Sequence, residues 1–231
     1  MANTKTSTHI SQQYDNELED LRAKVLSMGG LVEDRLLKVI DTLNRIDFEA
    51  AEFVAASDFE INDCEAEIDG ICSEIILRRT PAASDLRLVL AIFKVIRDLE
   101  RIGDETEKIA RLVLNLKTPR AIHIYYTGIL QMATQVRDIL RSSLDSFARM
   151  DSKLASEIAA MDEKIDSGVN LVMRQLITFT LEDTKVISSV LDAVLAARAL
   201  ERIGDHSRNI CEHVIYCVEG RNPEPKRFNA Q

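Results

Sequence analysis

The sequence predicts an all-α fold, a tandem repeat of two antiparallel three-helix bundles with six long helices. Apolar residues recur at intervals of three and four along most of the chain, which is the spacing of a helix face. Met28, Val32, Leu36, Ile40 and Leu43 form one such series. The composition agrees, because 46 % of the 231 residues are hydrophobic, 5 % are aromatic, and only four are Pro and eight Gly. So few turn-forming residues suit long helices better than a sandwich or a barrel.

The two halves of the chain resemble each other, and this repeat divides the fold in two. A constant offset of 104 positions aligns apolar and acidic residues of the first half with those of the second. The aligned positions are Met28, Val32, Leu36, Ile40, Leu43, Asp47, Asp58 and Ile61 with Met132, Val136, Leu140, Leu144, Phe147, Asp151, Asp162 and Ile165. The hexapeptide Leu-Glu-Arg-Ile-Gly-Asp occurs at 99–104 and again at 200–205, an offset of 101, as expected if the second half lacks three residues in between. Three helices per half with short connections make neighbouring helices antiparallel.

In the first half, polar caps set the expected helix boundaries. Asp47 is predicted to cap the second helix. Thr80 precedes Pro81, and this pair predicts an N-cap and first position for the third helix. The first predicted domain spans residues 10–116.

In the second half, the corresponding boundaries are expected at Thr118–Pro119, at Asp151 and at the capping-box sequence Thr180–Asp183. Gly220 is expected to end the last helix. The second predicted domain therefore spans residues 119–218, and residues 219–231 are predicted to form a flexible polar tail.

The repeated hexapeptide is the candidate functional motif. On a helix, Glu100 and Asp104 lie about 40° apart, while Leu99 and Ile102 point toward the predicted core. Two like charges at this spacing and a glycine inside a helix are both unfavourable. Their recurrence as Glu201 and Asp205 with a second glycine suggests that something compensates for them. A hard cation between the carboxylates would do so, which makes these four residues candidate metal ligands.

A neighbouring helix is expected to complete each site. Asp58 and Glu100 are about equally far from the turn near residue 80, so they should lie level, and Asn62 follows Asp58 by one helical turn. In the second half, Asp162 and Asp166 occupy the corresponding positions near Glu201. These four residues form a second tier of candidate ligands.

Other interpretations of the motif remain open. Exposed acidic pairs usually form solvated surface, and Arg97 and Arg101, or Arg198 and Arg202, would neutralise them without metal. The glycines would also allow close helix packing. A ferritin-like di-iron enzyme is disfavoured, because none of the four histidines has a Glu three residues before it. His206 and His213 are interpreted as surface or boundary residues.

Charge and motifs exclude several further classes. A net charge of −9 disfavours direct nucleic-acid binding. No apolar run is long enough to span a bilayer, and the polar N-terminus does not resemble a secretory signal. The four cysteines have no metal-binding spacing and are interpreted as reduced apolar residues of a cytoplasmic protein. No nucleotide-binding loop or catalytic triad is present, so the chain is predicted not to be an enzyme.

The doubled hexapeptide, together with Arg79–Arg87 and Met28–Gly30, closely resembles the PhoU family over about residues 10–218. The resemblance implies metal bound through Glu100/Asp104 and Glu201/Asp205, with Mg, Mn, Fe and Zn all possible ions. It implies a cytoplasmic adaptor that represses the phosphate-starvation response by contacting PstB, the ATPase of the Pst phosphate transporter, and the sensor kinase PhoR. A homodimer is also expected. The alternative is a metal-free helical adaptor.

Overall fold

The computed structural model of the protein describes residues 3–115, 122–160, 169, 172–178 and 187–221, and it is helical with no strand in these ranges. The helices are α1 (Asn3–Arg45), α2 (Phe48–Ala56), α3 (Phe59–Arg79), α4 (Ala83–Leu114), α5 (Ile122–Arg149), α6 (Ser152–Ala159) and α8 (Ile187–Glu219). The predicted all-α class is therefore confirmed. None of these described helices combines the length and apolar character needed to cross a bilayer.

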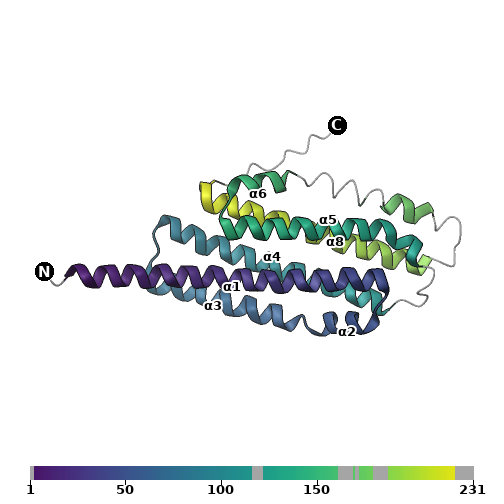
Figure 1. The fold of residues 1–231 in the computed structure, drawn as a ribbon, viewed down its shortest axis with the longest axis horizontal. Helices are drawn as coiled ribbons and strands as arrows, with labels where there is room; N and C mark the ends of the chain where they lie inside the picture. The colour runs from purple at the N-terminus through teal and green to yellow at the C-terminus, as the bar shows by residue number, and fades with distance from the viewer. Residues whose placement is uncertain (1–2, 116–121, 161–168, 170–171, 179–186, 222–231) are drawn as a thin grey trace.

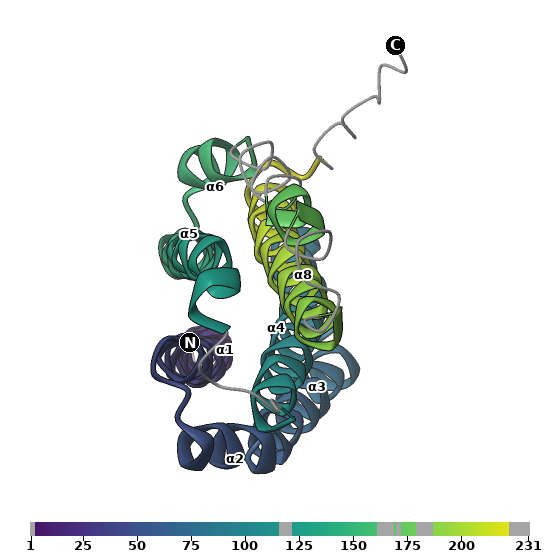
Figure 2. The ribbon, with the colours of Figure 1, turned by 90° about the vertical axis from the view of Figure 1, so that its right-hand side faces the viewer.

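The helices pack in two layers that run along the long axis of the molecule (Figure 1). Viewed end-on, α1 and α5 form one layer, and α3, α4 and α8 form the other (Figure 2). The short helices α2 and α6 lie at opposite edges. Contacts of α4 with α8 and of α1 with α5 join the two halves of the chain side by side.

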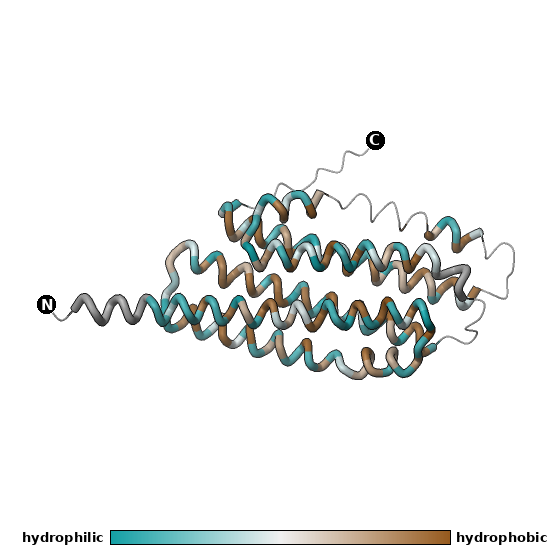
Figure 3. The backbone as a smooth tube through the Cα atoms, in the orientation of Figure 1, coloured by the Kyte–Doolittle hydropathy of each residue, from teal (hydrophilic) through white to brown (hydrophobic). Residues whose placement is uncertain are grey.

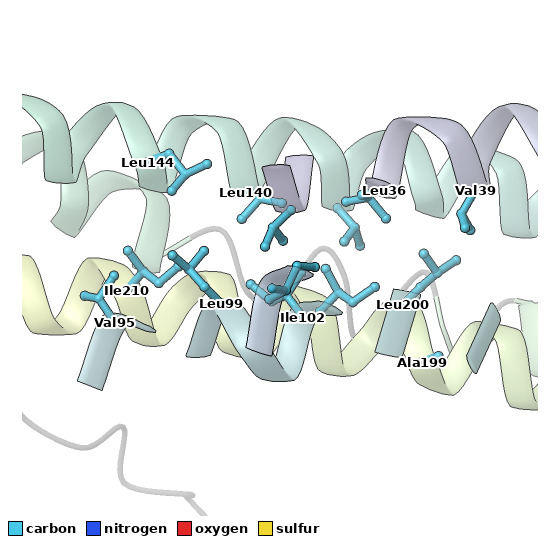
Figure 4. Packing of buried hydrophobic residues seen from close by; sticks show 14 of the residues in the cluster. Leu36, Val39, Val95, Leu99, Ile102, Leu140, Leu144, Ala199, Leu200 and Ile210 are labelled. Atoms are coloured by element: carbon cyan, nitrogen blue, oxygen red, sulfur yellow. The ribbon is translucent and has the colours of Figure 1, made fainter. Parts of the chain in front are cut away.

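The two repeats share one hydrophobic core. Leu99 of α4 and Leu200 of α8, the first residues of the two hexapeptides, are both fully buried in a cluster that contains residues of both halves. Figure 4 shows them with Ile102, opposite Leu36 of α1 and Leu140 of α5. Leu140 occupies the position in α5 that Leu36 occupies in α1, so the same repeat positions fill the core from both sides.

Three of the predicted boundaries are confirmed. The Asp47 carboxylate accepts a hydrogen bond from the amide of Ala50 at the start of α2. Asp151 does the same for Lys153 and Leu154 at the start of α6. Gly220, with a φ of 71°, follows the last residue of α8 as expected.

The prediction of six long helices is wrong in the first half. The expected second helix is divided into α2 and α3, because the chain breaks at Ser57 and Asp58. The buried Ser57 hydroxyl donates to the carbonyl of Val54, a local bond that competes with helix continuation. In the second half, the helix predicted to follow α5 likewise begins with a short segment, α6, of eight residues.

Thr80 is not an N-cap. It adopts a left-handed conformation, with a φ of 43°, and ends α3, whereas α4 begins two residues beyond Pro81 at Ala83. Pro81 disfavours right-handed helical backbone at the residue before it, so α3 cannot continue through Thr80 and ends there. Thr118–Pro119, Thr180–Asp183 and tail residues 222–231 lie outside the described part of the chain.

Candidate functional site

Glu100 and Asp104 lie on the flank of α4 that meets the start of α3. Their side chains are 21 % and 26 % exposed, so they are half-buried. Their positions on the helix, away from the core face, had suggested open surface instead. Gly103, between them, is buried, and a Cβ atom there would lie 2.9 Å from Cδ1 of Ile61 and 3.4 Å from Oδ1 of Asp58. The glycine thus allows the start of α3 to approach α4 closely, and this approach brings Asp58 to the acidic pair.

The carboxylates of this acidic flank, defined as Asp58, Glu100 and Asp104, repel one another. Burial raises the pKa of Glu100, and the neighbouring Asp104 raises it further, against the opposing effect of Arg101. Burial also raises the pKa of Asp58, with added repulsion from Glu107 and Asp104. Like charges that lie close together disfavour ionisation. The raised pKa values of Asp58 and Glu100 therefore mean that nearby cations compensate only part of the negative charge of the flank.

Two polar partners compensate part of this charge. Arg101 lies 3.3 Å from Oε2 of Glu100 and 3.3 Å from Oδ2 of Asp104. Asn62 donates to Oδ2 of Asp58 at 3.2 Å. The structure therefore gathers Asp58, Asn62, Glu100 and Asp104 in one region, as the equal distances from the turn suggested.

The flank offers oxygen atoms of the kind that hard cations prefer. The oxygens are not converged on a single point, because no group of three or more His, Cys, Asp or Glu side chains within the described ranges has metal-holding geometry. A cation at Glu100 and Asp104 would have to displace the Arg101 guanidinium. The carboxylate oxygens are suitable ligands for a metal ion. In the observed arrangement, however, Arg101 is the cation that neutralises Glu100 and Asp104.

In the second half, Glu201 and Asp205 lie on α8, also half-buried. Arg198 pairs with Glu201 at 2.7 Å, and Arg208 lies 3.8 Å from Asp205. Asp162 and Asp166 are outside the described residues. How the second acidic pair is completed therefore stays a prediction.

Arg202 does not neutralise the second acidic pair as proposed from the sequence. It reaches across to α4 and binds Oε1 of Glu105 at 3.1 Å, and Lys108 binds the same oxygen at 2.8 Å. Glu105 is buried, so the two cations compensate a charge that has little contact with water. This contact is part of the interface between the repeats.

A second polar cluster at the same interface was missed by the sequence analysis. Buried Asp98 of α4 accepts hydrogen bonds on Oδ1 from His206 at 2.8 Å and from Asn209 at 3.1 Å, and on Oδ2 from His213 at 2.9 Å. Burial raises the pKa of Asp98, but the three hydrogen bonds outweigh it and leave the pKa lowered. One feature of the sequence could have indicated this cluster. Asp98 lies at the edge of the apolar face of its helix, and the aligned residue of the second repeat is the apolar Ala199.

The interface contacts run antiparallel. Asp98 meets Asn209 while Glu105 meets Arg202, which places Gly103 and Gly204 level with each other at the middle of the α4–α8 pair. Each hexapeptide therefore lies where the two repeats meet, with its apolar residues in the shared core and its acidic residues on the flanks.

Comparison with known proteins agrees with this duplicated architecture. The PhoU domain pattern matches residues 25–113 and 129–214, one copy in each half. The phosphate-specific transport system accessory protein PhoU homolog of Pseudomonas putida is 44 % identical over 239 residues, covering 100 % of this chain and 92 % of that protein. The PhoU accessory protein of Escherichia coli is 40 % identical over 222 residues, covering 96 % of this chain and 92 % of that protein.

Solved structures give the same result. The crystal structure of PhoU from Pseudomonas aeruginosa superposes with a TM-score of 0.85 at 43 % identity, covering 90 % of this chain and 100 % of that one. The phosphate transport system regulatory protein PhoU from Streptococcus pneumoniae has a TM-score of 0.85 at 30 % identity, covering 92 % and 100 %. With one matched domain in each repeat and relatives aligned over nearly their whole length, the chain belongs to the PhoU family.

Proposed function

We propose that the protein is a non-enzymatic, cytoplasmic regulator of phosphate uptake that represses the phosphate-starvation response. In this role it links the transporter ATPase PstB to the sensor kinase PhoR, and it acts as a homodimer. The observation that supports the proposal most strongly is the match to phosphate-specific transport accessory proteins over almost the full length of both chains. The absence of a catalytic side-chain set in the sequence is consistent with an adaptor.

Deletion of the gene tests the regulatory role. In phosphate-rich medium, the deletion strain is expected to express phosphate-starvation genes that the parent strain keeps off, and a plasmid copy should restore repression. Transcript levels of a starvation-induced promoter are the measurement. Unchanged expression in the deletion strain would contradict the proposal.

We further propose that the acidic flank binds a divalent or ferric ion through Glu100 and Asp104, with Asp58 and Asn62 as additional ligands. A second ion would be bound in the other repeat by Glu201 and Asp205, with Asp162 and Asp166 as additional ligands. The raised pKa values of Asp58 and Glu100 support this, since burial first and neighbouring carboxylates second disfavour their ionised forms, and a bound cation would offset both effects. The metal would neutralise the flank and stiffen the contact between α3 and α4.

Replacing Glu100 and Asp104 with Ala together is expected to lower the metal content of protein purified without chelator, because two of the proposed ligands are lost. Helical content by circular dichroism should change little, since neither side chain lies in the core. Glu49 and Glu52, two exposed carboxylates on α2, provide the control when replaced with Ala. Metal content measured by mass spectrometry should be unaffected by that control.

A metal-free adaptor is the second candidate, and the contacts of Arg101 with both Glu100 and Asp104 favour it. If the native protein contains no metal at any site, this second candidate is supported and the metal proposal fails. The regulatory proposal is independent of that result.

A further inference from the structure

Three of the seven phenylalanines lie exposed along α2 and the start of α3. Phe48, Phe53 and Phe59 are 42 %, 51 % and 60 % exposed, although a large aromatic side chain gains free energy by burial. Figure 3 shows brown, apolar segments on α2 at the edge of the molecule. We call Phe48, Phe53 and Phe59 the aromatic edge.

The second repeat shows that the fold does not require aromatic residues at these positions. The inward residues Ala51 and Val54 of α2 correspond to Ala155 and Ile158 of α6, and all four are buried and apolar. The aromatic edge itself corresponds to Ser152, Glu157 and Glu163. The packing positions are thus apolar in both repeats, whereas the positions of the exposed phenylalanines are polar in the sequence of the second repeat, so the repeat does not need aromatic residues there to fold.

Two cationic side chains of α1 contact the ring of Phe53. The Lys38 ammonium lies 4.8 Å and the Arg35 guanidinium 5.1 Å from the centre of its ring. Arg35 is buried and pairs with Glu60 at 2.5 Å, and Lys38 pairs with Asp34 at 2.7 Å. A preorganised aromatic side chain loses little conformational freedom when a partner covers it.

The segment that carries the aromatic edge is strongly acidic, and the two α1 cations beside Phe53, Arg35 and Lys38, are each paired with a carboxylate. Residues 46–77 contain ten Asp and Glu and no Lys or Arg, a charge of −10 in a chain whose net charge is −9. The matching residues 150–181 contain five acidic and three basic residues, a charge of −2. On α2, the exposed Glu49 and Glu52 accompany Phe48 and Phe53 on the outer face. Aromatic residues and concentrated negative charge thus occur together in the first repeat only.

We propose that the aromatic edge is a docking surface for a partner protein that presents a basic, amphipathic segment. Apolar residues of that segment would pack on the phenylalanines, and its Lys or Arg residues would pair with the surrounding carboxylates. An anionic membrane surface is disfavoured, because the same carboxylates repel it. A symmetric dimer through this surface would bring two acidic regions together, which disfavours a second copy of the chain.

The test uses the full chain and a synthetic amphipathic helical peptide of Leu and Lys, with fluorescence anisotropy as the measurement. A triple variant, Phe48→Ser, Phe53→Glu and Phe59→Glu, introduces the residues that the sequence of the second repeat has at these positions. The triple variant is expected to bind the peptide at least tenfold more weakly, although it carries two more negative charges. The wild-type chain should not bind the same peptide with Glu in place of Lys.

Two further variants complete the design. Leu77→Ser removes an apolar side chain that is 82 % exposed elsewhere on α3 and should leave peptide affinity unchanged. Glu49→Gln with Glu52→Gln keeps the aromatic residues and should weaken binding severalfold, with a smaller dependence on salt.

Several results would overturn the proposal. One is a wild-type chain that fails to bind the Lys peptide, and another is a triple variant that binds it as well as the wild type does. Loss of binding to phosphatidylglycerol vesicles in the triple variant would identify a lipid partner instead. A wild-type dimer that becomes a monomer in the triple variant, measured by light scattering, would identify a second copy of the chain.

Discussion

Replacing Asp98 with Ala is expected to lower the free energy of unfolding by about 3 kcal/mol at neutral pH, because three donors lose a charged acceptor in a buried site. The carboxylate accepts from His206, Asn209 and His213, all on α8, while Asp98 itself is on α4. Its side chain is 11 % exposed, so water replaces little of what is lost. Chemical denaturation followed by circular dichroism measures the difference.

The pH dependence of the Asp98 contribution follows from the direction of its pKa shift. The pKa is lowered in the folded protein relative to an ordinary value of about 3.9. A lowered pKa means that the folded state prefers the ionised form, so the stabilisation is fully present above about pH 4. It is lost as the pH falls through the folded pKa. The stability difference between the wild type and Asp98→Asn should therefore shrink on acidification below pH 4.

Asp69→Asn provides the control for this acid-dependent effect. Asp69 lies exposed on α3, so its replacement should change stability by less than about 0.5 kcal/mol. A wild-type advantage over Asp98→Asn that stays constant from pH 5 to pH 3 would contradict the assignment of Asp98 as an ionised acceptor between the repeats.

Replacing Gly103 with Leu is expected to destabilise the protein by about 2 kcal/mol, because the new side chain would enter occupied space between α3 and α4. A Cβ atom alone would lie 2.9 Å from Cδ1 of Ile61 and 3.4 Å from Oδ1 of Asp58, so a larger side chain would have to displace both neighbours. Gly103→Ala should be nearly neutral, since the flexible end of Ile61 can shift while the helix gains about 1 kcal/mol of propensity. Thermal and urea unfolding report both values.

Gly30 is the matched control for the helix-propensity term. It lies inside α1, and apart from its chain neighbours and the backbone of its own helix no atom of the described residues lies within 4 Å of a Cβ built there. Gly30→Ala should therefore stabilise the protein by about 0.5–1 kcal/mol, without an opposing packing effect. If Gly103→Leu were as stable as the wild type, α3 and α4 would not need the close approach that places Asp58 beside Asp104.

Periodicity and repetition in the sequence determined the helical class, the duplication and several boundaries. The caps at Asp47 and Asp151 were predictable because a side-chain acceptor at a helix start acts locally, on amides two or three residues away. The core residues of α4 were predictable for a similar reason, since Leu99 and Ile102 follow the helical period. Local rules also gave the wrong helix start at Thr80, where the connection between α3 and α4 decides the conformation.

Only the tertiary structure shows which residues the side chains of the two hexapeptides and their neighbours contact. A helical wheel separates Glu100 and Asp104 from the core, but it contains no information about the helix that covers their flank or about the approach allowed by Gly103. It also gives no reason for Arg202 to pair with Glu105, or for Asp98 to meet two histidines more than 100 residues away. Sequence period fixes the direction of a side chain relative to its own helix, whereas its partners depend on how α4 and α8 pack against each other.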